Sequence, residues 1–258
     1  MKDKLLLAGL FLAAVPLVVN CSFTSSTLAL ENGKVRPLRI IAHRGYIETV
    51  RNVSFFTVKG VVQNNDTNNM RSINVTATFY DVGKEPIGII NTSTALEIVE
   101  PQSKTLFEIY MPLHSSPSPH NYSLTAEGLE TDEKPIASLE IANLTGWVDG
   151  EGFYRIVGEV HNKGSMVAKS VRVMCAYYDP NGNLITTSSD IVYPISVNPG
   201  GKADFELSSR PFPLAVGNFD LFIVVHHYER LTSANWILFS VLVAASFLFF
   251  VYMKRRGW

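Results

Sequence analysis

The chain has 258 residues, with 22 lysines and arginines against 23 aspartates and glutamates, so its formal net charge is −1. The two signs are interspersed and form no basic face, which excludes nucleic acid as an expected partner. Of the two cysteines, only Cys175 lies surely within the mature body. This excludes a disulfide framework, and we expect packing to stabilise the fold.

The N-terminus has the pattern of an export signal. Lys2 and Lys4 precede an unbroken apolar run from Leu5 to Val19. At ~1.5 Å per helical residue this run spans about 22 Å, which is short of a ~30 Å hydrocarbon core. Three outcomes remain open for residues 1–29: cleavage as a signal peptide, retention as an N-terminal anchor, or lipidation at Cys21.

A second apolar segment lies near the C-terminus and predicts a transmembrane helix over residues 234–253. Trp236 to Met253 carries no charged residue and spans about 27 Å as a helix. Lys254 to Arg256 follows, and the positive-inside rule keeps such a basic cluster in the cytoplasm. We therefore expect the body outside the cell and residues 254–258 as a cytoplasmic tail. A buried core helix is the alternative interpretation of this segment.

Between these ends the sequence repeats itself. Residues 56–108 and 154–206 share one pattern at a constant shift of 98 positions. A repeat of roughly 100 residues indicates a duplicated domain, since solenoid and propeller units have about 20 to 50 residues. The matched pairs are Gly60 and Gly158, Asn64 and Asn162, Tyr80 and Tyr178, Asp81 and Asp179, Pro101 and Pro199, Lys104 and Lys202, Phe107 and Phe205, and Glu108 and Glu206.

Each copy has the pattern of a β-sandwich. In the second copy, residues 154–161 and 171–177 alternate between apolar and polar side chains with the period of a half-buried strand. The run Asp179 to Gly182 then predicts a hairpin turn in which the glycine takes the left-handed conformation. About six or seven short strands per copy predict an immunoglobulin-like sandwich, although the cysteine pair and buried tryptophan of antibody domains are absent.

These patterns together predict an all-β body. We expect two tandem immunoglobulin-like β-sandwich domains, at residues 30–130 and 134–229, with a signal-like helix before them and a transmembrane helix after them. The polar linker from Gly128 to Pro135 has the composition of a domain boundary. We therefore expect the two domains to fold independently.

The repeated residues also resemble a known family. Both copies carry a G-x-V-x-N motif, a strand that ends in an aromatic residue followed by Tyr-Asp, a glycine turn and a Pro-x-x-Lys-x-x-Phe motif. This combination resembles the FxLYD domain family, which consists of small β-sandwich modules in exported and surface proteins of bacteria and archaea. Ala77 and Cys175 stand where the family has Phe, and Phe79 and Tyr177 replace its Leu. The resemblance implies no activity and no binding residues.

One glycine in each copy occupies a position where a β-branched residue is expected. Gly60 and Gly158 lie on the apolar face of a predicted strand, where glycine lowers stability unless another group approaches closely. We expect a large side chain to pack over each glycine, and Tyr80 and Tyr178 are the candidates.

Asparagine sequons are concentrated in the first part of the chain, and none follows residue 143. Such a tripeptide often arises by chance, but the clustering on an exported chain favours some glycosylation. This predicts a glycan-bearing membrane-distal domain and a bare membrane-proximal one. The possible N-glycosylation sites are Asn52, Asn65, Asn74, Asn91, Asn121 and Asn143.

The sequence offers no catalytic, cofactor or metal site. The run from Asp179 to Asn183 has the spacing of a calcium loop, but Leu184 stands where that loop requires glycine, so a hairpin turn is the better interpretation. His226 and His227 are adjacent on a predicted strand and point to opposite faces, so they cannot share a metal ion. No nucleophile elbow, metalloprotease helix, phosphate-binding glycine loop or Cys-His pairing is found. We therefore expect that the chain is not an enzyme.

The expected function follows from location and architecture. The sequence predicts a single-pass protein of the cell membrane, with an extracytoplasmic body and a cytoplasmic C-terminus. We expect an interaction or structural role in the cell envelope, with an unknown protein partner on the outer side. The alternative is an accessory subunit that docks on a larger membrane enzyme or transporter.

Overall fold

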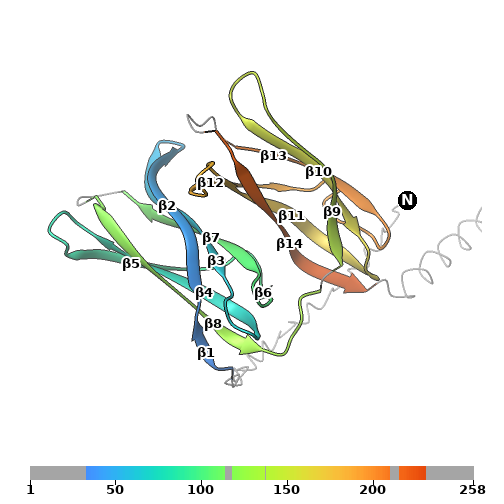
Figure 1. Ribbon diagram of the computed structural model, residues 1–258, viewed down its shortest axis with the longest axis horizontal. Coiled ribbons are helices and arrows are strands. Elements are labelled where there is room, and N and C mark those ends of the chain that lie inside the picture. The colour runs from blue at the N-terminus through green and yellow to red at the C-terminus, as the bar shows by residue number, and fades with distance from the viewer. Residues whose placement is uncertain (1–32, 114–117, 137, 210–214, 231–258) are drawn as a thin grey trace, which may run out of the picture. The chain divides into compact units, whose positions relative to one another are not determined.

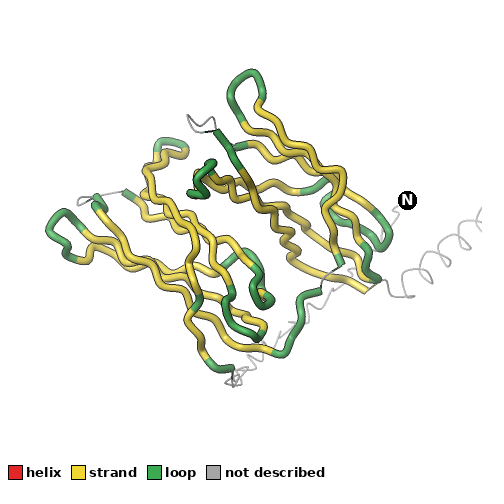
Figure 2. The backbone as a smooth tube through the Cα atoms, in the orientation of Figure 1, coloured by secondary structure: helices red, strands yellow, loops and turns green. Residues whose placement is uncertain are grey.

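The computed structural model describes residues 33–113, 118–136, 138–209 and 215–230 (Figure 1). Their regular structure consists of strands, and the described residues contain no helix (Figure 2). The all-β prediction is therefore confirmed for this part of the chain. The expected N-terminal helix and the expected span at 234–253 lie outside the described residues. Within the described ranges, no helix is long and apolar enough to cross a membrane.

The first repeat forms two antiparallel sheets. The larger has the order β1-β8-β4-β5, with β6 also paired to β4, and the smaller has the order β2-β3-β7. The strands are β1 (Val35–Pro37), β2 (Arg39–Val50), β3 (Val53–Gln63), β4 (Asn69–Tyr80), β5 (Pro86–Ser93), β6 (Ile98–Val99), β7 (Lys104–Pro112) and β8 (Asn121–Thr131).

The second repeat has the same plan, with antiparallel sheets in the orders β13-β10-β9 and β12-β11-β14. Its β10, β11, β13 and β14 correspond to β3, β4, β7 and β8 of the first repeat. The strands are β9 (Leu139–Val148), β10 (Tyr154–Asn162), β11 (Met166–Tyr178), β12 (Leu184–Ile191), β13 (Lys202–Ser208) and β14 (Asn218–Arg230).

Each repeat encloses a core between its two sheets, as in a β-sandwich. In the first repeat, Val58 of β3 and Phe79 of β4 belong to one buried cluster although they lie in different sheets. In the second repeat, Ile156 and Tyr177 do the same. The inward-facing residues are those that the period-two pattern predicted.

A third buried cluster joins the two repeats, which form one compact unit from Gly33 onward. It contains Val61 and Leu106 from the smaller sheet of the first repeat. The second repeat contributes residues of its β12-β11-β14 sheet, and the cluster therefore buries the outer faces of two sheets. These residues are Ala176, Tyr178, Leu184 and Phe222.

The repeated glycines lie beneath phenylalanines, not beneath tyrosines. Gly60 is paired with Phe107 across β3 and β7, and a Cβ atom on Gly60 would lie 2.4 Å from the Phe107 ring. Gly158 has the same relation to Phe205, with a closest approach of 2.8 Å. The expectation of a large covering side chain is confirmed, but the proposed Tyr80 and Tyr178 were wrong. Each ring belongs to the residue directly opposite on the neighbouring strand, where cross-strand pairs are closest.

The repeated asparagine anchors a loop in each repeat. The Asn64 side chain is fully buried and donates hydrogen bonds to the carbonyl oxygens of Asn68 (2.8 Å) and Val99 (2.9 Å). Asn162 makes the same two bonds to Met166 and Val197, both at 2.8 Å. The G-x-V-x-N motif therefore has a structural role in both copies.

The hairpin turn after β11 forms as predicted. Gly182 has a φ angle of +82°, and its amide donates to the Asp179 carbonyl oxygen at 3.0 Å. In the first repeat the corresponding left-handed residue is Lys84, with a φ angle of +67°. The glycine of that turn, Gly83, lies one position earlier. The turn conformation is thus preserved although glycine is not at the position that favours it.

Candidate functional site

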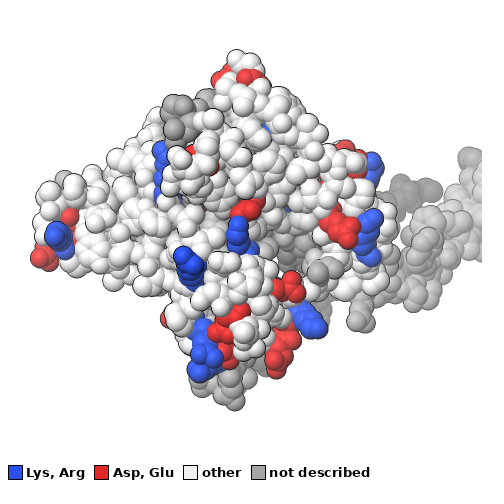
Figure 3. Space-filling model, in the orientation of Figure 1, with Lys and Arg blue, Asp and Glu red and all other residues white. Residues whose placement is uncertain are grey.

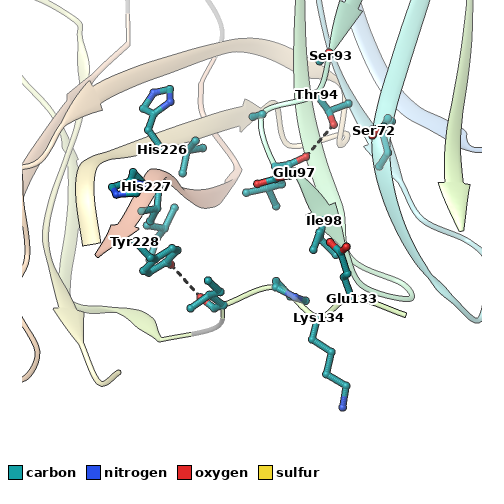
Figure 4. A pocket seen from close by; sticks show the side chains of 18 of the residues that line it. Ser72, Ser93, Thr94, Glu97, Ile98, Glu133, Lys134, His226, His227 and Tyr228 are labelled. Carbon is teal, nitrogen blue, oxygen red and sulfur yellow. Dashed lines mark hydrogen bonds between the residues drawn. The ribbon is translucent and has the colours of Figure 1, made fainter. Parts of the chain in front are cut away.

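A groove between the two repeats is the candidate functional site. It encloses about 870 Å³ and has three walls: residues 93–98, which connect β5 to β6, the linker 133–136, and residues 223–228 of β14 (Figure 4). A second cavity of about 220 Å³ shares residues of all three walls, among them Leu96, Pro135 and Ile223. The groove is thus lined by the linker and by segments of both repeats.

Apolar side chains lie on two walls of the groove. Leu96 and Ile98 line one wall, and Ile223 and Val225 line the opposite wall. Ile223 and Val225 also pack against the core of the second repeat, so their wall is held in place by that core. Apolar side chains on a rigid wall can bury the apolar side chains of a bound segment.

Polar groups lie at the rim of the groove. Glu97 is exposed and has no ion-pair partner among the described residues, whereas Glu133 lies 3.7 Å from the Arg71 guanidinium. The Tyr228 hydroxyl donates to the carbonyl oxygen of Ile136 at 3.0 Å, which ties the linker to β14 (Figure 4). The rim can therefore orient a bound chain, while the linker stays fixed.

The two adjacent histidines, which we do not expect to share a metal ion, lie on the β14 wall of the groove. His226 and His227 are both exposed on β14 and line the groove (Figure 4). Within the described ranges, no three His, Cys, Asp or Glu side chains come together as potential metal ligands. The arrangement therefore supports contacts to a bound segment and gives no reason to assign a metal.

A second polar cluster lies between the repeats, on another side of the interface. Lys59 is 9% exposed, and its ammonium group lies 3.2 Å from the Glu108 carboxylate and 3.5 Å from the Thr187 carbonyl oxygen. The hydroxyls of Thr187 and Tyr110 both donate to Glu108. Burial opposes ionisation of Glu108, but the Lys59 charge and these hydrogen bonds hold the pKa of its carboxyl below the usual value.

A third contact across the interface also pairs a lysine with a carboxylate that accepts a hydrogen bond from a hydroxyl. Lys104 donates to the Asp220 carboxylate at 2.8 Å, and the Tyr178 hydroxyl donates to the same oxygen at 2.9 Å. Burial raises the pKa of the Tyr178 hydroxyl, so it remains a donor. The acid and base groups of both clusters are bound to one another, and this arrangement favours a structural role over catalysis.

Sequence reasoning did not identify the groove or these clusters. Their residues come together only through contacts between the repeats, which a pattern within one repeat does not reveal. One signal was present in the comparison of the copies. Lys59 and Val61 correspond to Val157 and Glu159, so the outer face of this strand carries a different chemistry in each repeat.

The structure places three of the six possible glycosylation sites on one surface. Asn74 lies between buried residues of β4, and its partly exposed side chain lies on the outer face. Asn91 of β5 is opposite Thr76, and Asn121 of β8 is opposite Tyr80. Since Thr76 and Tyr80 share the face of Asn74, all three acceptor asparagines lie on the outer face of the larger sheet.

The other possible modification sites are separate. Asn52 and Asn65 are exposed in connections that flank β3, and Asn143 is exposed in β9. The Asn143 amide donates to Glu159 at 2.8 Å. Cys21 lies outside the described residues.

The calcium-like run and the internal cysteine have structural roles. The Asp179 carboxylate accepts hydrogen bonds from the amides of Asn181 (2.9 Å) and Asn183 (2.8 Å). Hydrogen bonds from Asn183, followed by those of the turn backbone, lower the pKa of Asp179. Cys175 is a free, buried thiol, and burial raises its pKa, so it is poorly reactive.

Surface charge does not mark any further site on the face displayed in Figure 3. Lysine and arginine side chains lie next to aspartate and glutamate side chains, and no broad field of one sign is visible there. This face therefore offers no charged patch as a second candidate site.

Comparisons with known proteins add little to this geometry. No family model matches the chain, and no curated protein matches it. Among solved structures, a transglutaminase from red sea bream is similar at 14% identity and a TM-score of 0.23. The similarity covers 73% of this chain and 32% of the transglutaminase. A similarity this weak carries no argument about fold or activity.

Proposed function

We propose that the chain is a non-enzymatic interaction protein of the cell envelope. In this proposal residues 234–253 anchor it in the membrane, and the β body binds a partner protein on the outer side. The body comprises two immunoglobulin-like domains that resemble FxLYD modules. Glycans would attach to the sequons that the exposed asparagines provide.

The observation that carries the proposal is the groove between the repeats. It combines apolar side chains, polar side chains and one edge of a β-sheet, which together suit a polypeptide partner. The ionisable groups between the repeats, such as Lys59 and Glu108, are bound to one another and are therefore not poised for chemistry. Binding is the function that this distribution of groups supports best.

The position of the groove along the chain favours the accessory-subunit alternative as a second candidate. Tyr228 lines the groove and lies only a few residues before the expected span at 234–253. A partner that sits in this groove would thus be close in sequence to the membrane segment. A larger membrane enzyme or transporter would meet that condition.

The test is to solubilise the full chain from its native membrane in mild detergent and to measure the native mass of the particle. We expect a partner at fixed stoichiometry. A peripheral or surface protein would support the first candidate, and an integral membrane enzyme or transporter would support the second. A chain that remains alone in every mild detergent would contradict both.

A further inference from the structure

The first repeat shows what covers the outer edge of its β8 strand. The short strand β1 pairs with it antiparallel, and Arg36 lies opposite Gly128. Beyond this strand, the Leu38 amide donates to the Ala126 carbonyl oxygen at 2.8 Å, and the Glu130 amide donates to the carbonyl oxygen of Lys34 at 3.1 Å. The edge of β8 from residue 126 to residue 130 is thus covered by β1 and the residues that flank it.

The equivalent edge in the second repeat belongs to β14. Val75 is paired with Ala126 across β4 and β8, and its counterpart Val173 is paired with Ile223 across β11 and β14. Further along, Met70 is paired with Glu130 and its counterpart Ala168 is paired with Tyr228, so residues 126–130 correspond to residues 223–228, with one extra residue in β14. These are the residues of β14 that line the groove.

No strand covers this second edge. β14 lies at the end of its sheet and pairs only with β11, and among the described residues no other backbone group bonds to the backbone of residues 223–228. The chain before β9 corresponds to β1 but takes another course. The Ser138 amide donates to the Ile136 carbonyl oxygen, and the Lys163 amide donates to that of Ser138.

We propose that an extended segment of a partner protein pairs antiparallel with β14 over residues 223–228, in the place that β1 occupies in the first repeat. The inference rests on the proposed function as an interaction protein and names its docking edge. Addition of a strand to an open sheet edge supplies backbone hydrogen bonds, and adjacent pockets select the side chains. Open edges of this kind are otherwise sites of unwanted association.

The walls of the groove define the chemistry of the bound segment. Alternate side chains of an added strand point to one face, and here they would meet the apolar wall of Leu96 and Ile98. The exposed Glu97 carboxylate on that wall, which lacks an ion-pair partner in the described ranges, suits a lysine or arginine of the segment. We therefore expect a segment that alternates apolar residues with a basic one.

The backbone groups that receive the segment follow from the first repeat. The Ala126 carbonyl and the Glu130 amide face β1, and outward-facing groups recur at every second residue of an antiparallel edge. The corresponding outward amides on β14 are those of Val225 and Tyr228, because the residues opposite them, Val171 and Ala168, form backbone hydrogen bonds on the side away from β14. Proline at such a position removes the edge donor and leaves the pairing with β11 intact.

The test uses the full chain and a synthetic peptide with the sequence of residues 33–38, the strand that fits the equivalent edge. In the free chain, the Val225 amide should exchange hydrogen at least about tenfold faster than the Glu130 amide. Added peptide should slow exchange at Val225 and Tyr228. Val225→Pro should weaken peptide binding by about tenfold, whereas the matched Val225→Ala keeps the amide and should bind within about twofold of the parent.

Three results would overturn the docking edge. The first is a Val225 amide that is already protected in the free monomer. The second is equal peptide binding by Val225→Pro and Val225→Ala when both proteins keep a cooperative unfolding transition. The third is protection that rises with protein concentration, which would assign the edge to β1 of a second copy. If a partner co-purifies with the full chain in any of these cases, the proposed function survives and only its docking edge is wrong.

Discussion

Asn64 and Asn162 make the same hydrogen bonds in both repeats: each side chain donates to the carbonyl oxygen of a valine and to that of the residue four positions later. Both asparagines are fully buried, and the bonds to Val99 and Val197 are buried as well. A buried carbonyl that loses its donor costs more free energy than the hydrogen bond itself contributes. The recurrence of this asparagine is therefore explained by loop stability.

Replacement of Asn162 by alanine should lower the free energy of unfolding by about 1–3 kcal/mol, because the carbonyls of Met166 and Val197 each lose one donor. Chemical denaturation of the full chain measures this change. Asn198→Ala is the control, since Asn198 is exposed, and it should change the free energy by less than about 0.5 kcal/mol. Equal effects of the two substitutions would refute the role of the buried amide.

The contact between Gly158 and Phe205 makes a second prediction. Gly158→Val should lower stability by about 1–3 kcal/mol through overpacking, despite the better strand propensity of valine. Thermal unfolding is the measurement. In the background of Phe205→Leu the same substitution should cost less, because the ring that it displaces is gone. An unchanged or raised unfolding temperature for Gly158→Val would contradict this explanation.

At the scale of the elements, the sequence predicted the strands and turns that depend on a local pattern of residues. The alternation in β10 and β11 and the turn at Gly182 all follow from neighbouring residues. β1 was not predicted, because a three-residue strand that contains proline carries no periodic signal. It forms because its backbone completes the edge of β8.

The remaining elements could not be predicted because their environment comes from the other repeat. In β3, Lys59 and Val61 lie on the face that should be exposed in an isolated sandwich, yet both are buried. Their partners, such as Thr187 and Ala176, are more than a hundred positions away. Pairing over this distance is fixed by the fit of two sheet faces, and no motif within one repeat encodes it.

Glu108 of β7 should make the stability that the interface contributes depend on pH. Glu108→Gln should lower stability by about 1–3 kcal/mol near neutral pH, because the buried Lys59 loses its counter-charge, with allowance for partial solvent access. The pKa of Glu108 is lowered in the folded chain. Its contribution is therefore present above the usual glutamate pKa of about 4.3 and is lost as the pH falls through the lowered value.

Denaturation of the parent and of Glu108→Gln at a series of pH values measures this dependence. The difference between the two proteins should shrink as the pH falls below about 4. Glu206→Gln is the matched control, because Glu206 occupies the corresponding position in the second repeat and is exposed. A difference that is constant with pH would show that the charge of Glu108 is not involved.

At the scale of the whole molecule, the two repeats have separate cores and also share a buried interface. Each sandwich encloses its own cluster, and Tyr178 and Phe222 belong to the cluster between them. The separate cores are what independent folding requires. The shared cluster implies that each repeat gains stability from the other.

A fragment of residues 134–229 should therefore fold as a soluble β protein with a cooperative thermal transition, at a lower temperature than the complete body. The reason is that Tyr178 and Phe222 would face water in the fragment. Circular dichroism and calorimetry measure both properties. An unfolded fragment beside a stable complete body would contradict independent folding.

The proposed role depends on the body lying outside the cell, and protease accessibility tests this most directly. Protease is added to intact cells that carry the full chain with a tag after Trp258. The account predicts that residues 31–229 are digested, that a membrane-embedded stub beginning near Leu231 remains, and that the tag is reached only after permeabilisation. Digestion of the tag with protection of the repeats would place the β body in the cytoplasm and contradict the account.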